Sequence, residues 1–303
     1  MDSARKMALT NKQDMCPVRD LNPQQSLRRR RIYPVNRTGH SPYYKVPDKN
    51  RQHRTSLIGL ISFTIRAMNL LLLEPNQIFD NQASIAGRQL EHLIKVQRAA
   101  VGDTVRLGML NGLMGQGCIR AMDSEQALLD IELDTEPPSA LPLTLILALP
   151  RPKMLRRTLQ TVAAMGVKSI YLINSFRVEK SFWQTPFLAP EAIEEQLILG
   201  LEQARDTSMP AVHQRKLFKP FVEDELAEII AGSQALVAHP IADRGCPVDC
   251  QSPVTLAIGP EGGFIPYEID KLNQTGFESV HLGQRILRVE NAVPALLSRL
   301  FPA

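Results

Sequence analysis

The pattern of apolar and polar positions along the chain changes near residue 138. Between Met68 and that point, short alternating or β-rich runs are separated by turn-forming residues, which predicts strands. The predicted strands span 69–73, 77–85, 104–110, 117–121 and 126–133, with turns at 102–103 and 111–112. Apolar residues at helical spacing predict one amphipathic helix over 87–97. This pattern favours a small β-barrel with a single helix.

A proline-rich segment then interrupts the strand pattern. Residues 135–142 read Thr-Glu-Pro-Pro-Ser-Ala-Leu-Pro. Proline cannot donate a backbone hydrogen bond and fixes its own φ, so three prolines in eight residues indicate a stiff linker. We therefore expect two domains, one over 68–138 and one over 139–303.

After the linker, buried strands alternate with helices. Strands are predicted at 143–149, 167–173, 211–218, 235–238, 253–258 and 279–282, and helices at 153–165, 190–205, 222–231, 266–275 and 290–301. Gly166 directly follows the first of these helices and is expected to end it. Such alternation is typical of an α/β domain with a mostly parallel sheet covered on both faces. Ligands of these sheets bind at the carboxyl ends of the strands.

Composition excludes several classes of protein. The 303 residues are 44% apolar and 22% charged, which is typical of a globular protein rather than a disordered one. The longest uncharged apolar stretches fall far short of the roughly 20 residues that a membrane helix needs. No membrane partner is therefore expected.

The net charge of +4 is unevenly distributed. Residues 1–67 contain 14 Lys and Arg and 4 acidic residues, a balance of +10, which leaves −6 for residues 68–303. The first segment is polar and rich in Pro and Arg, so it cannot bury enough apolar surface to offset the entropy of ordering, and we expect disorder. The overall charge is therefore no evidence for a nucleic-acid partner.

Several interpretations of residues 1–67 remain open. They form a basic RNA-binding arm around Arg28–Arg31, a targeting peptide, or upstream sequence. A secretory signal is excluded because no apolar region follows the first charges at the required distance. The run 19–40 resembles a transfer-RNA gene translated in a non-coding frame, so we favour a non-native extension with the native start at Met68.

The cysteines indicate neither a disulfide framework nor a metal site. The four residues Cys16, Cys118, Cys246 and Cys250 are too few and too scattered for a framework in a chain this long. The spacing of the last two does not match zinc ribbons, so we expect no metal. A reducing cytoplasm is the expected compartment.

Two glycine-containing loops after predicted strands contain the most unusual sequences. Residues 256–264 read Leu-Ala-Ile-Gly-Pro-Glu-Gly-Gly-Phe, and residues 281–295 read His-Leu-Gly-Gln-Arg-Ile-Leu-Arg-Val-Glu-Asn-Ala-Val-Pro-Ala. Glycines after a buried strand allow backbone N–H groups to approach a ligand closely. Taken alone, the first loop is equally typical of a tight strand-to-helix turn without a ligand.

Together, these two motifs resemble the RsmE family of RNA methyltransferases. A third stretch, Glu202-Gln-Ala-Arg205 followed by Pro210, is similar to the Glu-Gln-x-x-Arg-x-x-x-Pro element of that family. The resemblance extends from Met68 to the C-terminus. The helix at 153–165 departs from the family pattern, because Leu155 and Ala164 replace two acidic residues.

The resemblance implies a fold, a cofactor and partners. Family members are SPOUT-class enzymes that methylate N3 of a uridine in 16S ribosomal RNA with S-adenosyl-L-methionine. They have a PUA-like β-barrel followed by an α/β domain with a deep trefoil knot, and they are homodimers whose cofactor sites are completed by the partner subunit. The implied partner is 16S ribosomal RNA or the assembled small ribosomal subunit.

The resemblance also suggests which residues bind the cofactor. The main-chain groups of the 282–287 segment are expected to grip the adenine, and the glycine loop to surround the ribose and methionine parts. The His239-Pro240 loop is a further candidate, although a lone histidine there is more often structural. The candidate cofactor residues are His239, Gly259, Pro260, Glu261, Gly262, Gly263, Leu282, Gly283, Ile286 and Leu287.

Candidates for catalysis and RNA binding come from charge. Arg288 is the candidate cation that stabilises the uridine anion, and Glu290 is either the base or a helix-capping acid. Arg285 is an RNA or ion-pair residue. The RNA-binding candidates are Arg151, Lys153, Arg156, Arg157 and Arg205, although the cluster could be a solvated helix start and Arg205 could pair with Glu202. Phe182 and Trp183 could stack a base, but core packing is the simpler interpretation.

Two other functions remain open. One is a methyltransferase of the same class that acts on a transfer RNA or a large-subunit site. The other is a non-catalytic RNA-binding assembly factor with a vestigial cofactor site. The intact glycine loops argue against the second, because an empty site gives no physical reason to keep them.

Overall fold

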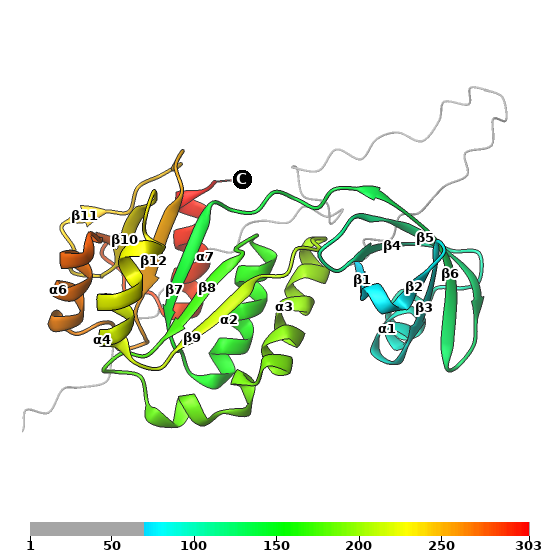
Figure 1. The fold of residues 1–303 in the computed structure, drawn as a ribbon, viewed down its shortest axis with the longest axis horizontal. Helices are drawn as coiled ribbons and strands as arrows, with labels where there is room; N and C mark the ends of the chain where they lie inside the picture. The colour runs from blue at the N-terminus through cyan, green and yellow to red at the C-terminus, as the bar shows by residue number, and fades with distance from the viewer. Residues whose placement is uncertain (1–69, 303) are drawn as a thin grey trace, which may run out of the picture. The chain divides into compact units, whose positions relative to one another are not determined.

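The computed structural model describes residues 70–302, which form two β-sheets (Figure 1). The expectations about residues 1–67, including the basic run Arg28–Arg31 and a native start at Met68, lie outside the described residues. Each sheet has its own cluster of buried apolar side chains, the smaller one beneath the first sheet.

The first sheet has six strands in the order β1-β4-β5-β6-β3-β2. The strands are β1 (Leu71–Leu73), β2 (Ile78–Phe79), β3 (Gln82–Ala86), β4 (Thr104–Met109), β5 (Met114–Met122) and β6 (Gln126–Thr135), and a 3-10 turn, η1 (Pro75–Gln77), precedes β2. Only the β1–β4 pair is parallel. Leu73, Ile85, Leu93 and Leu107 are fully buried beneath the sheet. This mixed sheet forms a half-barrel, which fits the PUA-like β-barrel implied by the resemblance.

Two predicted elements of this half differ in detail. The single strand predicted over 77–85 is wrong, because Asp80 and Asn81 both have positive φ and turn the chain between β2 and β3. Two adjacent residues with positive φ fit the tight turn that joins antiparallel strands. The predicted helix over 87–97 is α1 (Gly87–Glu91) continued by a π-helical segment, η2 (His92–Gln97).

The second sheet has seven strands in the order β11-β13-β10-β12-β7-β8-β9, and every pair is parallel. The strands are β7 (Leu143–Ala148), β8 (Ser169–Ile173), β9 (Ala211–Arg215), β10 (Gln234–Ala238), β11 (Arg244–Gly245), β12 (Val254–Ile258) and β13 (Glu278–His281). The five residues of β12 are all buried. Such uninterrupted burial requires cover on both faces, which confirms the predicted α/β class.

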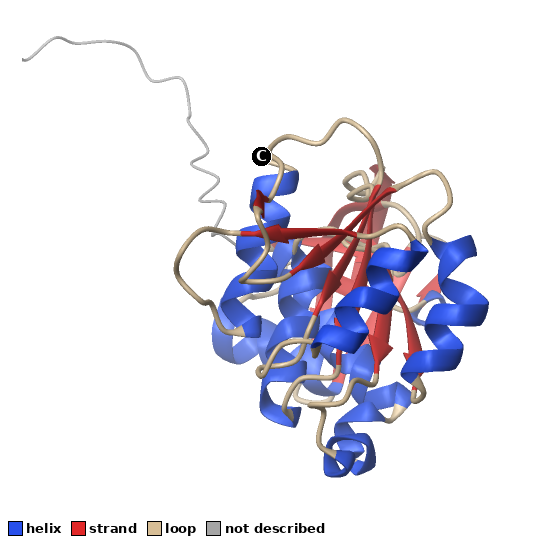
Figure 2. Cartoon of the chain, turned by 90° about the vertical axis from the view of Figure 1, so that its left-hand side faces the viewer, coloured by secondary structure: helices blue, strands red, loops and turns tan. Residues whose placement is uncertain are grey.

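Helices lie on both faces of this sheet (Figure 2). They are α2 (Pro152–Ala164), α3 (Pro190–Ala204), α4 (Phe218–Pro220), α5 (Leu226–Ile229), α6 (Pro266–Thr275) and α7 (Val289–Leu300), with short turns η3 (Lys180–Gln184), η4 (Pro186–Leu188) and a π-helical η5 (Phe221–Glu225). Helix α2 packs against α3 and α7, whereas α6 packs against η5. Gly166 ends α2 with φ +83°, as predicted. The single helix predicted over 222–231 is instead η5 followed by α5.

The strand order contains a crossover around β13, and the trefoil knot implied by the resemblance stays a prediction. The chain leaves β10, contributes β11 on the far side of β13, and returns to β12 on the opposite side of β10. Strand β13 therefore lies inside this excursion, although it comes later in the sequence. The returning loop also contacts α7, because the backbone N–H of Cys250 donates to the Leu300 carbonyl at 2.7 Å. No helix in the described part of the chain is long and apolar enough to span a membrane.

Candidate functional site

A cavity of about 600 Å³ lies at the carboxyl ends of three neighbouring strands. Strands β10, β12 and β13 end at Ala238, Ile258 and His281, and the loops that follow them form its walls. Because parallel strands end at the same edge of the sheet, loops distant in sequence meet here. The volume lies within the range of small-molecule and cofactor sites.

The cavity gathers every residue predicted to bind the cofactor. Those lining residues are His239, Gly259, Pro260, Glu261, Gly262, Gly263, Leu282, Gly283, Ile286 and Leu287. Their common location makes one binding site from the three loops. Their individual contacts to a ligand remain predictions.

The loop after β12 needs glycine for two physical reasons. A Cβ at Gly259 would lie 2.9 Å from the Phe264 backbone nitrogen, too close for any side chain. Gly263 has φ +72°, a conformation that glycine adopts without strain, and its N–H donates to the Pro260 carbonyl at 2.7 Å. The loop is therefore a tight backbone turn at the cavity wall.

The segment after β13 offers free backbone donors. Gly283 has φ +116°, and its N–H donates to Nδ1 of His281 at 2.8 Å. Within residues 70–302, the N–H groups of Ile286 and Leu287 donate to no protein acceptor. The Ile286 side chain is 80% exposed. The segment can thus give main-chain hydrogen bonds and apolar cover to a ligand, which is the role that the resemblance implies for it.

The His239 loop contributes a half-buried imidazole. The His239 N–H donates to the Val280 carbonyl at 2.9 Å, which joins this loop to β13. Burial lowers the pKa of the imidazole from its ordinary value of 6.5. The ring is therefore mainly neutral at physiological pH, so it adds no cation to the cavity.

The two catalytic candidates lie at the start of α7. Arg288 is exposed, and its carbonyl accepts hydrogen bonds from the N–H groups of Asn291 and Ala292. Glu290 is half-buried in the first turn, where an acid interacts favourably with the helix dipole, and the N-cap residue Arg288 makes no side-chain capping hydrogen bond. Neither residue lines the cavity, although their neighbours Leu287 and Val289 do. Their catalytic roles therefore stay predictions.

A cluster of basic side chains lies beside the glycine loop. Arg151, Lys153, Arg156 and Arg157 are all exposed at the start of α2. The Arg151 N–H donates to Oε1 of Glu261 at 3.1 Å, which joins the cluster to the cavity wall. The guanidinium of Arg156 lies 5.1 Å from the centre of the Phe187 ring, so part of that side chain is held by a cation–π contact.

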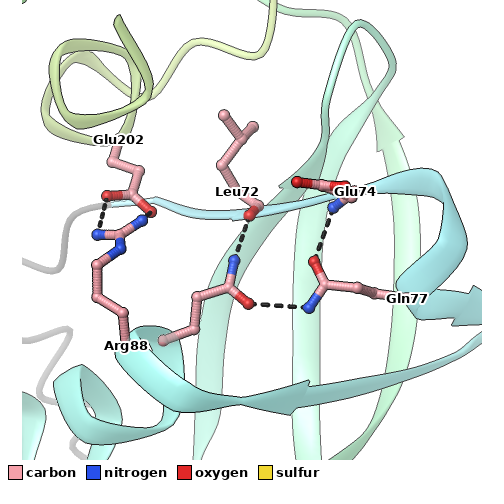
Figure 3. Close-up of polar contacts among 6 residues, drawn as sticks. Leu72, Glu74, Gln77, Arg88 and Glu202 are labelled. Carbon is pink, nitrogen blue, oxygen red and sulfur yellow. Dashed lines mark hydrogen bonds and ion pairs between the residues drawn. The ribbon is translucent and has the colours of Figure 1, made fainter. Parts of the chain in front are cut away.

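The predicted alternative that Arg205 pairs with Glu202 is wrong. Glu202 instead accepts two hydrogen bonds, at 2.9 and 3.0 Å, from the Arg88 guanidinium, which comes from the first sheet's helix (Figure 3). Arg205 ends α3 with φ +57°, and its exposed side chain lines a second cavity together with Arg106. No acidic partner of Arg205 is found within residues 70–302.

The aromatic pair Phe182 and Trp183 packs on the core, as the simpler interpretation predicted. Both side chains lie against the larger apolar cluster. The indole N–H of Trp183 donates to Oδ1 of Asn174 at 3.0 Å. A half-buried indole with a satisfied donor is typical of a structural aromatic.

Sequence reasoning missed two residues from other elements. Arg177, in the loop after β8, lines the cavity and donates a hydrogen bond to the Gly262 carbonyl. Glu268 of α6 is only 3% exposed, and its carboxylate accepts from the N–H groups of Phe176 and Ile265, at 2.7 and 2.9 Å. The sequence signal for Arg177 was its position after the buried strand β8, which ends at the same edge of the sheet as β10, β12 and β13.

The arrangement supports ligand binding and positioning. Its wall combines tight glycine turns, free backbone donors and apolar side chains, with cations at the rim. Among residues 70–302, no three His, Cys, Asp or Glu side chains are grouped to hold a metal ion. Burial raises the pKa of the Cys246 thiol to about 11, which keeps it in the protonated form, a poor metal ligand.

Comparison with known proteins gives a family for this part of the chain. A model described as an RNA methyltransferase domain matches residues 137–301, which is more than half of the chain. A protein of Treponema pallidum named ribosomal RNA small subunit methyltransferase E is 29% identical over 237 residues, covering 75% of this chain and 88% of that protein. A Borreliella burgdorferi protein named methyltransferase E 1 is 24% identical, with coverage of 75% and 95%.

Solved structures show the same fold. One from Neisseria gonorrhoeae, a ribosomal RNA small subunit methyltransferase E bound to S-adenosyl methionine, has a TM-score of 0.61 at 22% identity, covering 76% of this chain and 95% of that one. A Legionella pneumophila protein described as a putative methyltransferase in complex with the same cofactor has a TM-score of 0.60 at 22% identity, with coverage of 76% and 96%.

Proposed function

Because the chain belongs to the RNA methyltransferase family, we propose that it methylates N3 of a uridine in 16S ribosomal RNA with S-adenosyl-L-methionine. The observation that carries the proposal is the single cavity that gathers the three predicted cofactor loops. Relatives that are named ribosomal RNA small subunit methyltransferases, and that match over 88% and 95% of their own length, support the choice of RNA.

The residues of the cavity fit the proposed cofactor. Its volume of about 600 Å³ suits a ligand of this size, and a Cβ at Gly259 would displace the backbone that forms the wall. The free N–H groups of Ile286 and Leu287 are donors for an adenine ring. When bound, the cofactor supplies an electrophilic methyl group.

The residues must also activate the uridine. Uridine N3 carries a proton at neutral pH, so its departure leaves negative charge on the ring. The exposed cation Arg288 would stabilise this charge, and Glu290 would accept the proton, with both residues at the start of α7. The remaining contribution of the protein is positioning of the two reactants.

The RNA would approach across the basic cluster. Arg151, Lys153, Arg156 and Arg157 place positive charge beside the glycine loop, and Arg205 adds a cation at the end of α3. Phosphate contacts of this kind supply affinity without sequence specificity. They account for RNA binding by a region that is net acidic over residues 68–303.

The wider organisation follows the same proposal. Residues 68–138 would form a barrel domain and residues 139–303 the catalytic domain. The protein would act as a homodimer in the cytoplasm, where its ribosomal substrate is. The exposed apolar side chains of Ile241 and Ile286 beside the cavity suit burial against a second subunit.

A transfer assay tests the proposed function. Purified protein is incubated with methyl-labelled cofactor and, separately, 16S RNA, small ribosomal subunits, 23S RNA and transfer RNA, and the nucleosides are separated. N3-methyluridine from 16S RNA or small subunits is the expected result. Label in another RNA alone would favour the alternative methyltransferase, and cofactor binding measured by calorimetry distinguishes an inactive assay from a vestigial site.

A further inference from the structure

Arg177 lies in the cavity without having been a candidate for any role. Its loop joins β8 to η3, and its backbone is fixed from two sides. The neighbouring Phe176 N–H is bound by the buried Glu268 carboxylate at 2.7 Å, and the Val178 N–H donates to the Ser175 carbonyl at 3.1 Å. The arginine therefore extends from a rigid anchor.

The Arg177 side chain crosses the glycine loop. Its Nη1 donates to the Gly262 carbonyl, and a Cβ at Gly262 would lie 2.8 Å from Cδ of Arg177. The backbone of Gly262 would itself accept a side chain, because its φ is not positive. The space for a side chain at Gly262 is instead occupied by the stem of Arg177. The two residues form one structural unit at the cavity wall.

The guanidinium keeps hydrogen-bonding capacity for a ligand. It has five N–H donors, and the bond to Gly262 uses one nitrogen. No carboxylate pairs with Arg177 within the described residues. The other titratable groups lining the cavity are His239, His281, Arg285, Glu261 and Asp270. Arg177 therefore lines the cavity as an exposed cation that forms no ion pair and is held to the glycine loop by one hydrogen bond, whereas Arg288 does not line the cavity.

We infer that Arg177 contacts the target uracil and stabilises the negative charge that develops on its carbonyl oxygens during methyl transfer. This inference rests on the proposed function. The N3–H bond breaks and its proton passes to a carboxylate or to solvent, the N3–CH₃ bond forms, and the sulfonium C–S bond breaks to leave a neutral thioether. The charge on the ring exists only while these changes are under way, so a preorganised cation accelerates the reaction.

Replacement of Arg177 tests this role directly. For Arg177→Ala, we expect kcat to fall by about 10²-fold, the effect typical of losing one such donor, with cofactor affinity changed less than twofold. The acid limb of the kcat–pH profile should also move to higher pH, because loss of the cation makes the N3 proton harder to remove. Arg177→Lys should recover part of kcat. Lys180→Ala, which removes an exposed cation three residues away, is the matched control and should behave as wild type.

The effect on kcat of combining substitutions at Arg177 and Gly262 tests the inference independently. Gly262→Ala should push the arginine stem aside, and it should lower kcat by a larger factor in the Arg177 protein than in the Arg177→Ala background, where no stem remains to be displaced. Non-additivity of this kind identifies residues that act as one unit. Full additivity of the two substitutions would contradict the inference.

The outcomes separate this inference from the proposed function. If wild-type protein binds the cofactor but methylates no uridine in any RNA, both the proposed function and the inference are overturned. If wild type transfers methyl groups and Arg177→Ala transfers them equally fast, only the inference is overturned. A large loss of cofactor affinity in Arg177→Ala at unchanged pH profile would also overturn it, and would assign the arginine to the cofactor carboxylate.

Discussion

Glu268 is the residue that holds two loops of the cavity in register. Its carboxylate is 3% exposed and accepts one N–H from the loop after β8 and one from the start of α6. A buried acceptor of this kind stabilises the fold only while both donors are in place. The geometry of the site therefore depends on an acid that does not line the cavity.

Glu268→Gln should destabilise the protein by about 2 kcal/mol, because the amide nitrogen faces one backbone donor instead of accepting from it. Urea unfolding followed by circular dichroism measures the free energy of unfolding. Asp270→Asn, an exposed acid on the same helix, is the control and should change it by less than about 0.5 kcal/mol. Equal stabilities of the two variants would contradict the role assigned to Glu268.

Gly259→Ala should weaken cofactor binding at least about tenfold, since the added Cβ would lie 2.9 Å from the Phe264 backbone nitrogen and must shift the cavity wall. Calorimetric titration with S-adenosyl-L-methionine measures the effect. Gly245→Ala provides the control, because a Cβ at Gly245 meets no atom within 4 Å. Wild-type affinity in Gly259→Ala would show that this turn does not form the cofactor wall.

Burial lowers the pKa of the His239 imidazole in the folded protein. As pH falls, this imidazole is therefore protonated in the unfolded chain before it is protonated in the folded protein. The contribution of the neutral imidazole to the free energy of unfolding is fully present above about pH 6.5, the ordinary pKa. It decreases as the pH falls from that value through the lower pKa of the folded protein. His239→Gln should therefore lose less stability between pH 7 and pH 5 than wild type, measured as the change in urea midpoint. Identical changes in the two proteins would contradict the assignment.

At the scale of elements, the Arg88–Glu202 ion pair joins α1 of the first sheet to α3 of the second. The Arg88 guanidinium faces the Glu202 carboxylate (Figure 3). The carboxylate of Glu202 is nearly buried, while the Arg88 side chain is half exposed. The Leu70 N–H also donates to the Glu202 carbonyl at 2.9 Å. Glu202 belongs to the motif that resembled the RsmE element, so this part of the motif serves packing between elements.

Arg88→Met should lower stability by about 1–2 kcal/mol, a value reduced from that of a fully buried pair because solvent screens the exposed arginine. Glu202→Gln in the same protein should then cost little more. A double-mutant cycle from urea unfolding measures the coupling. Strictly additive losses would mean that the ion pair contributes nothing to stability.

Element-level prediction from the sequence succeeded where a regular pattern dictates structure. Continuous apolar runs such as Leu143–Leu149 became buried parallel strands, and Gly166 ended its helix. Prediction of elements failed where the local backbone departs from a regular strand or α-helix. The turn at Asp80–Asn81 split a predicted strand, and π-helical turns in η2 and η5 shifted helix bounds without changing apolar spacing.

The candidate site was predicted in part from the sequence. The loops after β12 and β13 carry unusual glycines and were recognisable from residue order, and His239 pointed to the loop after β10. Arg177 was not, because its role depends on where β8 ends relative to β12, which is a property of strand order in space. The partner of Glu202 was missed for the same reason, since Arg88 is 114 residues away in the sequence.

For the whole molecule, charge placement matters more than net charge. The positive balance belongs to residues 1–67, whereas residues 68–303 are net acidic. Positive side chains nevertheless gather around the cavity, at the start of α2 and in the loops that carry Arg177 and Arg285. Local clusters of this kind steer an RNA to a site even on an acidic protein.

The central claim is that this cavity serves N3 methylation of a uridine in 16S ribosomal RNA. The most direct measurement is mass spectrometry of 16S RNA from the native host after disruption of the gene and after complementation with wild type or Gly259→Ala. We expect N3-methyluridine to disappear on disruption and to return with wild type, with less or none restored by Gly259→Ala. An unchanged amount of N3-methyluridine in the 16S RNA of the disrupted strain would contradict the account.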